Sequence, residues 1–321
     1  MLNRLYGWIS RNLFYGVLLS LAAGYFFPLE ATPLLRRSVM VLFGYMTLVT
    51  ALGTSFREFL KVSRSPKVPL YILSIVHIGT PVVAWIVGRL VFPDNHNIQI
   101  GYLIFAAIPV GVTSIIWTAI VKGNVPVSLV TVTIDTIVAP LLLPVYILVV
   151  VGVAVSIDYT AMAAELLVMI TLPSIIGMLL HDRTGGRTMA FVQGLGGVAS
   201  RMSFFGVIYL SAAVVAPTIV WNAAIVKVLL VTMFVVVCSY LLGFAASRVI
   251  HADHGITLAM IYNTGMRNIA TGLVIAAGYF PPEVAIPITL GMLFQQPLAA
   301  LTARLYSKMH PGYYAETKTA V

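Results

Sequence analysis

The chain has 321 residues, of which 60% are hydrophobic and 9% are charged, and its mean hydropathy is +1.00. Because soluble domains carry about 25% charged residues, this composition excludes a soluble globular protein and indicates an integral membrane protein. The net charge of +9 would suggest a nucleic-acid partner in a soluble protein, but here the basic residues lie in short loops that orient helices in the bilayer. We therefore expect the lipid bilayer as surroundings and no nucleic-acid partner. The single Cys238 supports neither a disulfide framework nor a metal cluster.

Apolar stretches of about 20 residues predict transmembrane helices. In chain order we predict ten, at residues 12–28, 38–54, 68–91, 98–121, 125–152, 160–180, 203–221, 224–249, 255–280 and 284–306. Arg4 and Arg11 precede the first apolar run as in a signal peptide, but no small-residue cleavage site follows, so we interpret this run as the first helix. The sequence thus predicts an all-α membrane protein.

Charged loops predict the orientation of these helices. The loops on one side hold the basic residues Arg57, Lys61, Arg64, Lys67, Lys122, Arg183, Arg187, Arg201 and Arg248. The opposite loops hold Asp94, Asp158 and Glu283, with Arg36 and Arg37 as the exception. By the positive-inside rule the basic side is cytoplasmic. Both termini are then cytoplasmic, which Arg304, Lys308 and Lys318 support, and we expect a bacterial inner membrane.

Ten helices divide into two halves of five, residues 1–157 and 158–321, and an odd number in each half inverts the second half relative to the first. The stretches PVGVTSIIWTAIVKG (109–123) and NTGMRNIATGLVIAAG (263–278) support this division, because each carries two glycines 12 or 13 residues apart and precedes a proline-rich helix. Glycine beside proline or asparagine interrupts a membrane helix, and matching interruptions in two inverted halves indicate the midplane site of a transporter. A kinked helix without a ligand is the alternative.

The same stretches resemble the bile acid:sodium symporter family, within the larger bile/arsenite/riboflavin transporter group. IPVGVTSIIWTAIVKGNVPVS (108–128) is similar to the family's Pro-Gly-Gly-Thr-Ala-Ser-Asn stretch and the Arg/Lys-Gly-Asn turn after it, and IYNTGMRN (261–268) is similar to its Glu-x-Gly-Met-Gln-Asn stretch. The resemblance implies a panel domain of helices 1, 2, 6 and 7 and a core domain of helices 3–5 and 8–10, with helices 4 and 9 broken where they cross. It also implies alternating-access transport of small organic anions. We expect a monomer without a cofactor.

The resemblance implies a sodium site from which this chain departs. Members that bind sodium use a Ser-Asn pair in the fourth helix, hydroxyls in the fifth, Glu and Gln in the ninth and a Gln in the third. Ser114 and Ser128 match, whereas the other positions hold Ile115, Val132, Asn263, Arg267 and His77. Sodium needs several hard oxygen ligands and usually a carboxylate, so the residual positions Ser114, Ser128 and Asn263 leave sodium coupling in question. Sodium and protons are both candidate coupling ions.

Three ionisable residues are predicted to lie deep in the membrane: His77, Asp135 and Arg267. A charged side chain at the bilayer centre costs roughly 2.5–3.5 kcal/mol, so such residues are usually paired and functional. Ser128, Thr131 and Asp135 fall on one face of the fifth helix, in a polar stripe about 10 Å long that should face the crossing. We predict that Arg267 pairs with Asp135 and acts as a built-in cation where a sodium ion would sit.

Three roles for this pair stay open: a structural ion pair, a proton-coupling site, and direct binding of an anionic substrate by Arg267. Arginine does not give up its proton, so Asp135 and His77 are the candidate proton carriers, with a satisfied core histidine as the alternative for His77. The predicted site also includes the polar residues Thr113, Ser114, Thr264, Asn268, Gln295 and Gln296. Half-helix N-termini at the two breaks can receive a carboxylate. We interpret the glycine-rich, basic stretch 184–201 as a cytoplasmic connector, with an interfacial helix as the alternative.

A secondary transporter of small organic anions is therefore the predicted function. One alternative is a sodium-coupled symporter with a modified site. Another is a membrane sensor that kept the fold and lost transport, although no cytoplasmic domain is predicted to carry its output. An enzyme is not predicted, because no HExxH, GxSxG or paired-aspartate motif lies in the spans.

Overall fold

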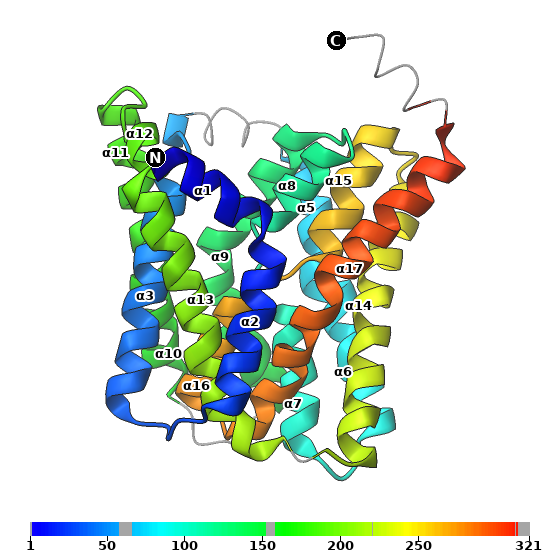
Figure 1. Ribbon diagram of the computed structural model, residues 1–321. Coiled ribbons are helices and arrows are strands. Elements are labelled where there is room, and N and C mark those ends of the chain that lie inside the picture. The colour runs from blue at the N-terminus through cyan, green and yellow to red at the C-terminus, as the bar shows by residue number, and fades with distance from the viewer. Residues whose placement is uncertain (1, 58–65, 152–157, 220, 312, 314–321) are drawn as a thin grey trace.

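The computed structural model describes residues 2–57, 66–151, 158–219, 221–311 and 313 (Figure 1). Within these ranges the chain is almost entirely helical and has no β-strand apart from one isolated bridge. Lys61, Arg64 and Lys318, which entered the orientation prediction, lie outside the described residues, as does the predicted boundary between the two halves at 157. The prediction of an all-helical protein is confirmed.

The α-helices are α1 Leu2–Arg11, α2 Leu13–Phe26, α3 Pro33–Ala51, α5 Lys67–Ser74, α6 Thr80–Val91, α7 His96–Ala107, α8 Thr113–Ile120, α9 Val125–Val151, α10 Tyr159–Leu166, α11 Leu172–Arg183, α12 Thr188–Val192, α13 Leu195–Val215, α14 Ala223–Val249, α15 His254–Gly265, α16 Ile269–Tyr279 and α17 Ala285–Met309. Short π-helical segments, Ile75–Gly79 and Leu167–Thr171, join α5 to α6 and α10 to α11. Seven helices in the described part of the chain are long and apolar enough to cross a membrane: Pro33–Ala51, Lys67–Val91, Val125–Val149, Thr160–Arg183, Leu195–Val215, Ala223–Val249 and Pro282–Met309. The chain is therefore an integral membrane protein.

The other three predicted spans are shorter or interrupted. The first, at 12–28, is the 14-residue helix α2. The fourth, at 98–121, is divided into α7 and α8, and the ninth, at 255–280, is divided into α15 and α16. The total of ten spans and the inverted relation between the two halves stay predictions.

The predicted seventh helix, at 203–221, has the wrong boundaries. The helix α13 begins at Leu195 and ends at Val215, so Arg201 lies well inside it and the stretch 184–201 is not a simple connector. The mean hydropathy of this part of the sequence is low because it is rich in glycine and serine, so a helix beginning here is not recognised from hydropathy. Close packing explains those small residues: a Cβ at Gly197 would lie 1.9 Å from the carbonyl oxygen of Val192.

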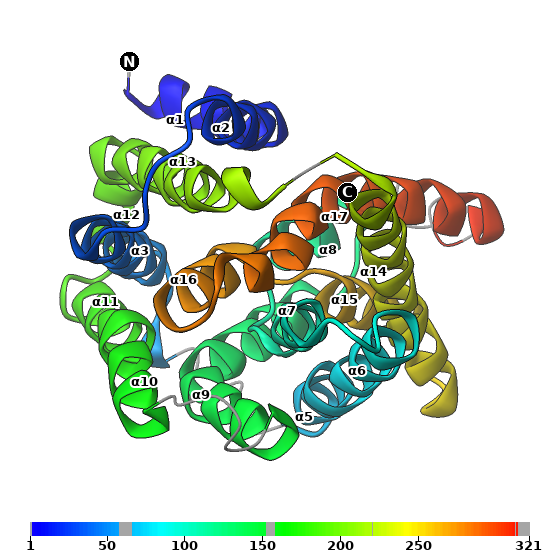
Figure 2. The ribbon, with the colours of Figure 1, turned by 90° about the horizontal axis from the view of Figure 1, so that it is seen from below.

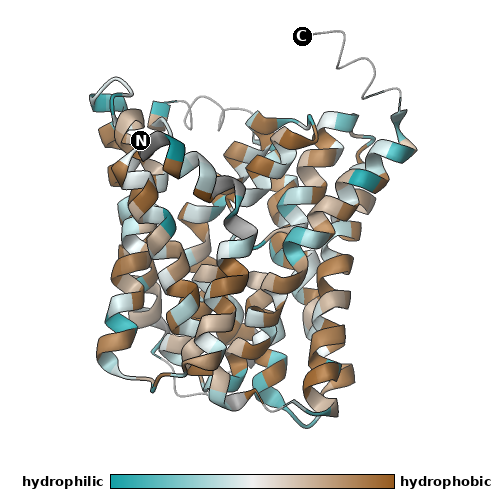
Figure 3. Cartoon of the chain, viewed as in Figure 1, coloured by the Kyte–Doolittle hydropathy of each residue, from teal (hydrophilic) through white to brown (hydrophobic). Residues whose placement is uncertain are grey.

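The helices form two groups (Figure 2). In the first group, which we call the helix row, α13 contacts α1, α2 and α3, α3 contacts α11, and α10 continues α11 through the π-helical segment. In the second, which we call the crossing group, α14 contacts α6, α15 and α17, α17 contacts α7 and α16, and α9 contacts α5, α8 and α15. The groups meet where α16 contacts α3 and α13 and where α10 contacts α9. Hydrophobic residues cover the length of both groups, and hydrophilic residues gather toward the two ends (Figure 3).

Replacing Gly243 by alanine is expected to lower the free energy of unfolding by about 1–3 kcal/mol, because overpacking forces a close helix contact apart. The added Cβ would lie 2.7 Å from the carbonyl oxygen of Met260, where α14 supports the interrupted segment α15–α16. Unfolding of the purified protein with SDS in mixed micelles measures this change. Gly44→Ala is the matched control, since its nearest atom, the carbonyl oxygen of Met169, is at an ordinary 3.8 Å. Equal stability of the two variants would contradict the close α14–α15 contact.

Candidate functional site

The two interrupted segments cross at the centre of the crossing group and satisfy each other's backbone. Helix α7 ends before Pro109, which has no N–H and holds the preceding residue in an extended conformation. The N–H of Gly111 donates to the carbonyl of Met266 at 3.0 Å, and the N–H of Asn268 donates to the carbonyl of Pro109 at 2.7 Å. Unpaired backbone groups are costly inside a membrane, so this pairing is what permits both breaks.

Glycine is required at this crossing because the two backbones nearly touch. A Cβ on Gly111 would lie 2.9 Å from the carbonyl oxygen of Arg267. The neighbouring residue, Val110, forms the isolated antiparallel bridge with Arg267. The crossing therefore holds the backbone of Arg267 in a fixed place.

Asp135 on α9 and His77 on the π-helical segment form a buried pair beside the crossing. The Nε2 atom of His77 lies 2.5 Å from Oδ1 of Asp135, and Oδ2 accepts a hydrogen bond from the backbone N–H of Val110 at 2.6 Å. Both side chains are almost completely buried. Tyr146 on α9 donates from its hydroxyl to the carbonyl of His77. Nδ1 of His77 is buried without a hydrogen-bond partner, and π-helical turns of this kind often mark functional sites.

The Arg267 guanidinium is also buried, but its partners are neutral oxygens. Nη2 donates to Oγ1 of Thr80 and to the carbonyl of Val76 at 3.2 Å, and Nη1 donates to the carbonyl of Ile108 at 3.4 Å. Its backbone N–H donates to Oε1 of Gln295. Carbonyl and hydroxyl oxygens are the ligands that hard metal cations prefer, so the guanidinium is enclosed as such a metal ion would be.

The predicted ion pair between Arg267 and Asp135 is therefore wrong in its partners. The carboxylate of Asp135 pairs with His77, and the guanidinium turns toward the oxygens of α5–α6 and the end of α7. Spacing along helices placed these charges at one crossing, but it could not decide between two partners approaching from different helices. The three ionisable residues share one buried region, as charges in a membrane interior usually do.

Four neutral side chains form a second buried cluster, from α8, α9 and α15. The Oγ of Ser114 donates to Oδ1 of Asn263 at 3.2 Å, and Nδ2 of Asn263 donates to Oγ of Ser128. The hydroxyls of Thr118 and Ser128 are 2.8 Å apart. All four side chains are fully buried and each has a hydrogen-bond partner. This neutral cluster joins α8, α9 and α15 without a carboxylate.

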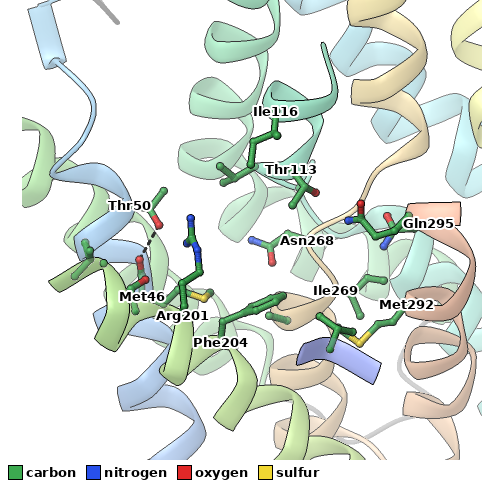
Figure 4. Close-up of a pocket in the computed structure, with 18 of the residues that line it drawn as sticks. Met46, Thr50, Thr113, Ile116, Arg201, Phe204, Asn268, Ile269, Met292 and Gln295 are labelled. Atoms are coloured by element: carbon green, nitrogen blue, oxygen red, sulfur yellow. Dashed lines mark hydrogen bonds between the residues drawn. The ribbon is translucent and has the colours of Figure 1, made fainter. Parts of the chain in front are cut away.

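A cavity of about 300 Å³ lies between the helix row and the crossing (Figure 4). The predicted residues Thr113, Asn268, Gln295 and Gln296 line it, and Gln296 accepts a hydrogen bond from Trp117 at 2.8 Å. The N-termini of α8 and α16 both reach it, with Asn268 as the N-cap of α16. Two of the predicted site residues, Thr131 and Thr264, do not line this cavity. Their hydroxyls donate to backbone carbonyls of their own helices.

Sequence reasoning missed the residues that the helix row contributes to this cavity. Arg201, Ser200 and Phe204 on α13 and Tyr6 on α1 line it opposite the crossing. Arg201 was assigned to a cytoplasmic loop because its flanking residues have low hydropathy. The same-face spacing of Gly197, Ser200, Arg201 and Phe204 on a helix is the only signal that could have indicated a shared surface.

Away from the cavity, a polar contact connects the helix row and the crossing group. Glu165 on α10 pairs with Arg36 on α3 at 2.9 Å and accepts a hydrogen bond from the hydroxyl of Tyr279 on α16. The Arg36 guanidinium also lies over the Tyr279 ring, 4.8 Å from its centroid. This contact lies at the end of the bundle opposite α1 and α12 (Figure 1). The cavity instead extends toward the end that holds α1 and α12, where Tyr6 and Val192 line it.

Comparison with known proteins identifies the family. The profile of the Sodium Bile acid symporter family matches residues 39–220. "Uncharacterized protein YbaS" of Bacillus subtilis (strain 168) is 30% identical over 261 residues, which cover 81% of this chain and 85% of that protein. "Uncharacterized sodium-dependent transporter YocS" of the same organism is 23% identical over 70% of this chain and 69% of its own length. "Probable sodium/metabolite cotransporter BASS2, chloroplastic" of Oryza sativa subsp. japonica is 22% identical over 86% of this chain and 65% of its own length.

The family profile spans more than half of the chain, and the identity to YbaS extends over most of it. The helices long enough to cross a membrane agree with a transporter of this kind. The resemblance drawn from the two glycine-containing stretches is confirmed. This chain is a membrane transporter that belongs to the sodium bile acid symporter family.

Proposed function

We propose that the protein is a secondary active transporter of small organic anions that works by alternating access and does not depend on sodium. The helix row is the panel domain and the crossing group is the core domain, and the substrate binds in the cavity between them. The two halves, 1–157 and 158–321, are inverted repeats of five helices each. The chain acts as a monomer in a bacterial inner membrane with both termini in the cytoplasm.

The observation that carries this proposal is the position of the Arg267 guanidinium. It lies at the crossing among the oxygens of Val76, Thr80 and Ile108. A tethered cation at this place supplies the positive charge that a bound metal ion would supply, and it removes the electrostatic reason to bind one. The neutral cluster around Asn263 also lacks the carboxylate that sodium usually requires.

Protons are the coupling ions in this proposal. The buried pair of His77 and Asp135 is the group that can gain or lose a proton, because Arg267 keeps its own. Proton uptake on one side and release on the other would then follow the alternating access of the cavity.

Uptake into reconstituted vesicles, with sodium and proton gradients imposed separately, tests this function. The probe is the radiolabelled anion that gives the largest thermal shift in a screen of carboxylates and sulfonated steroids, carried out with and without sodium. We expect accumulation that follows the proton gradient and is unchanged when potassium replaces sodium. Sodium-driven accumulation would instead indicate a sodium-coupled symporter with a modified site, in line with the names of the relatives YocS and BASS2. Saturable binding without any flux would indicate a sensor.

Replacing Tyr279 by phenylalanine is expected to favour the conformation in which the cavity opens toward the Glu165 end. The change removes the hydrogen bond from Tyr279 on α16 to the Glu165 carboxylate on α10, and such a bond contributes roughly 1.5–3 kcal/mol, less where water has access. In this proposal the bond keeps this end of the cavity closed. A thiol reagent added from that side should then modify a cavity cysteine at Ile116→Cys about five- to tenfold faster. Tyr25→Phe is the matched control, because the hydroxyl of Tyr25 on α2 accepts a hydrogen bond from Trp221, in the segment between α13 and α14, and not from the Glu165 contact. An unchanged rate in the Tyr279 variant would show that this contact does not close the cavity.

A further inference from the structure

Arg201 is a cavity cation with unused hydrogen-bonding capacity, as is Arg267, whose Nε atom is also buried without a partner. It projects from α13 into the space between Thr50 and Asn268 (Figure 4). Its Nη2 donates to the hydroxyl of Tyr6 at 3.2 Å, and its guanidinium lies 5.2 Å from the centroid of the Tyr6 ring. The Nε atom of Arg201 is buried without a hydrogen-bond partner. In the described part of the chain the two ion pairs are those of Arg36 and His77, so no carboxylate pairs with Arg201.

The neighbouring Ser200 adds a second unsatisfied group. Its side chain is 1% exposed and lines the cavity, and its Oγ has no hydrogen-bond partner. Buried polar groups without partners are costly, and so is a guanidinium in a low-dielectric cavity without a counter-charge. Both deficits end when an anionic oxygen enters, because it accepts from the guanidinium and from the hydroxyl.

The charge of the cavity sets the charge of the ligand. Among the described residues that line it, Arg201 and Arg267 are the charged ones. The guanidinium of Arg267 already contacts the oxygens of Val76, Thr80 and Ile108. The buried carboxylate of Asp135 lies near enough to offset the positive charge of Arg267. Arg201 is therefore the guanidinium left without a counter-charge, which matches one negative charge on the ligand. A second carboxylate on the ligand would lie without a counter-charge.

The remaining walls are largely apolar. Met46, Ile116, Phe204 and Met292 surround the space beside Arg201 (Figure 4). A volume of about 300 Å³ is at the lower end of small-molecule sites. These walls fit a compact apolar body that carries one anionic group.

We propose that Arg201 is the specificity-determining residue of the substrate site, where it binds the single anionic group of a compact, largely apolar organic monoanion together with Ser200 and Tyr6. This inference rests on the proposed transport function and deepens it by naming the charge and shape of the substrate. The walls around the body come from both groups, with Met46 and Phe204 in the helix row and Ile116 and Met292 in the crossing group, so both domains take part in recognition.

Charged thiol reagents test this proposal without a known substrate. In a Cys238→Ser background, Ile116→Cys places one thiol in the cavity, at a residue that is 50% exposed. Two methanethiosulfonate reagents of similar size are compared, the anionic sulfonatoethyl and the cationic trimethylammonioethyl compound. We expect Arg201→Gln to lower the ratio of the anionic to the cationic rate constant by about tenfold or more, because one charge acts on the two reagents in opposite directions. Arg201→Lys should retain most of the ratio.

Arg187→Gln is the matched control, since it removes an exposed arginine outside the cavity and should leave the ratio unchanged. An equal ratio with and without Arg201, in variants that elute like the parent on size exclusion, would overturn the proposal. So would a cavity thiol that the anionic reagent does not modify. If the protein transports a probe but the ratio of the two rate constants does not depend on Arg201, this inference fails and the transport function stands. If the ratio depends on Arg201 and no probe is transported, the transport function fails instead.

Discussion

Replacing Arg267 by glutamine is expected to abolish uptake and to lower the free energy of unfolding by about 2–4 kcal/mol. The change leaves the oxygens of Val76, Thr80 and Ile108, which now accept from one guanidinium, without that donor. It also removes the positive charge beside the buried carboxylate of Asp135. A shorter neutral amide cannot contact all three segments at once. Unfolding with SDS in mixed micelles and uptake into vesicles measure the two effects.

The matched variants separate charge from geometry. Arg267→Lys keeps the charge but offers one ammonium group to three dispersed oxygens, so we expect intermediate stability and weak uptake. Arg187→Gln removes an exposed arginine and should leave both properties unchanged. An Arg267→Gln variant with the stability and uptake of the unmodified protein would show that the guanidinium has no part in the crossing.

Asparagine in place of Asp135 is expected to uncouple transport from the proton gradient while leaving the protein folded. The amide has nearly the same shape as the carboxylate and can still accept the hydrogen bond from Val110 and contact His77. It cannot carry a proton. Accumulation against a gradient should therefore fall to background, whereas exchange of labelled for unlabelled anion across the membrane should continue.

Thr131→Val is the control for this change, because Thr131 lies one turn away on α9 and bonds only to its own helix. We expect its proton-driven accumulation to equal that of the unmodified protein. Sodium-driven accumulation that survives Asp135→Asn would refute the idea that a tethered cation replaces sodium.

The interrupted helices could be predicted because the causes of interruption are local. Pro109, Gly111 and Gly265 mark the breaks in the sequence itself, and the freed backbone groups then require partners inside the protein. That the two breaks supply those partners to each other, through Val110 and Arg267, follows from their crossing and not from either stretch alone.

The pairing of charges could not be predicted in the same way. Asp135 meets His77 because the α5–α6 segment approaches α9, and no periodicity within either helix encodes that approach. Arg201 was missed for a different reason. Small residues lower the hydropathy of the first turns of α13, yet those residues are there to allow close packing against Val192 and Tyr6.

Binding of radioactive sodium to the purified protein, displaced by unlabelled sodium chloride at constant ionic strength, tests the central claim most directly. The guanidinium of Arg267 replaces a mobile sodium ion in this account, so the measurement should show no saturable sodium binding, in the presence or absence of a transported anion. Saturable binding of one or two sodium ions per chain would contradict it.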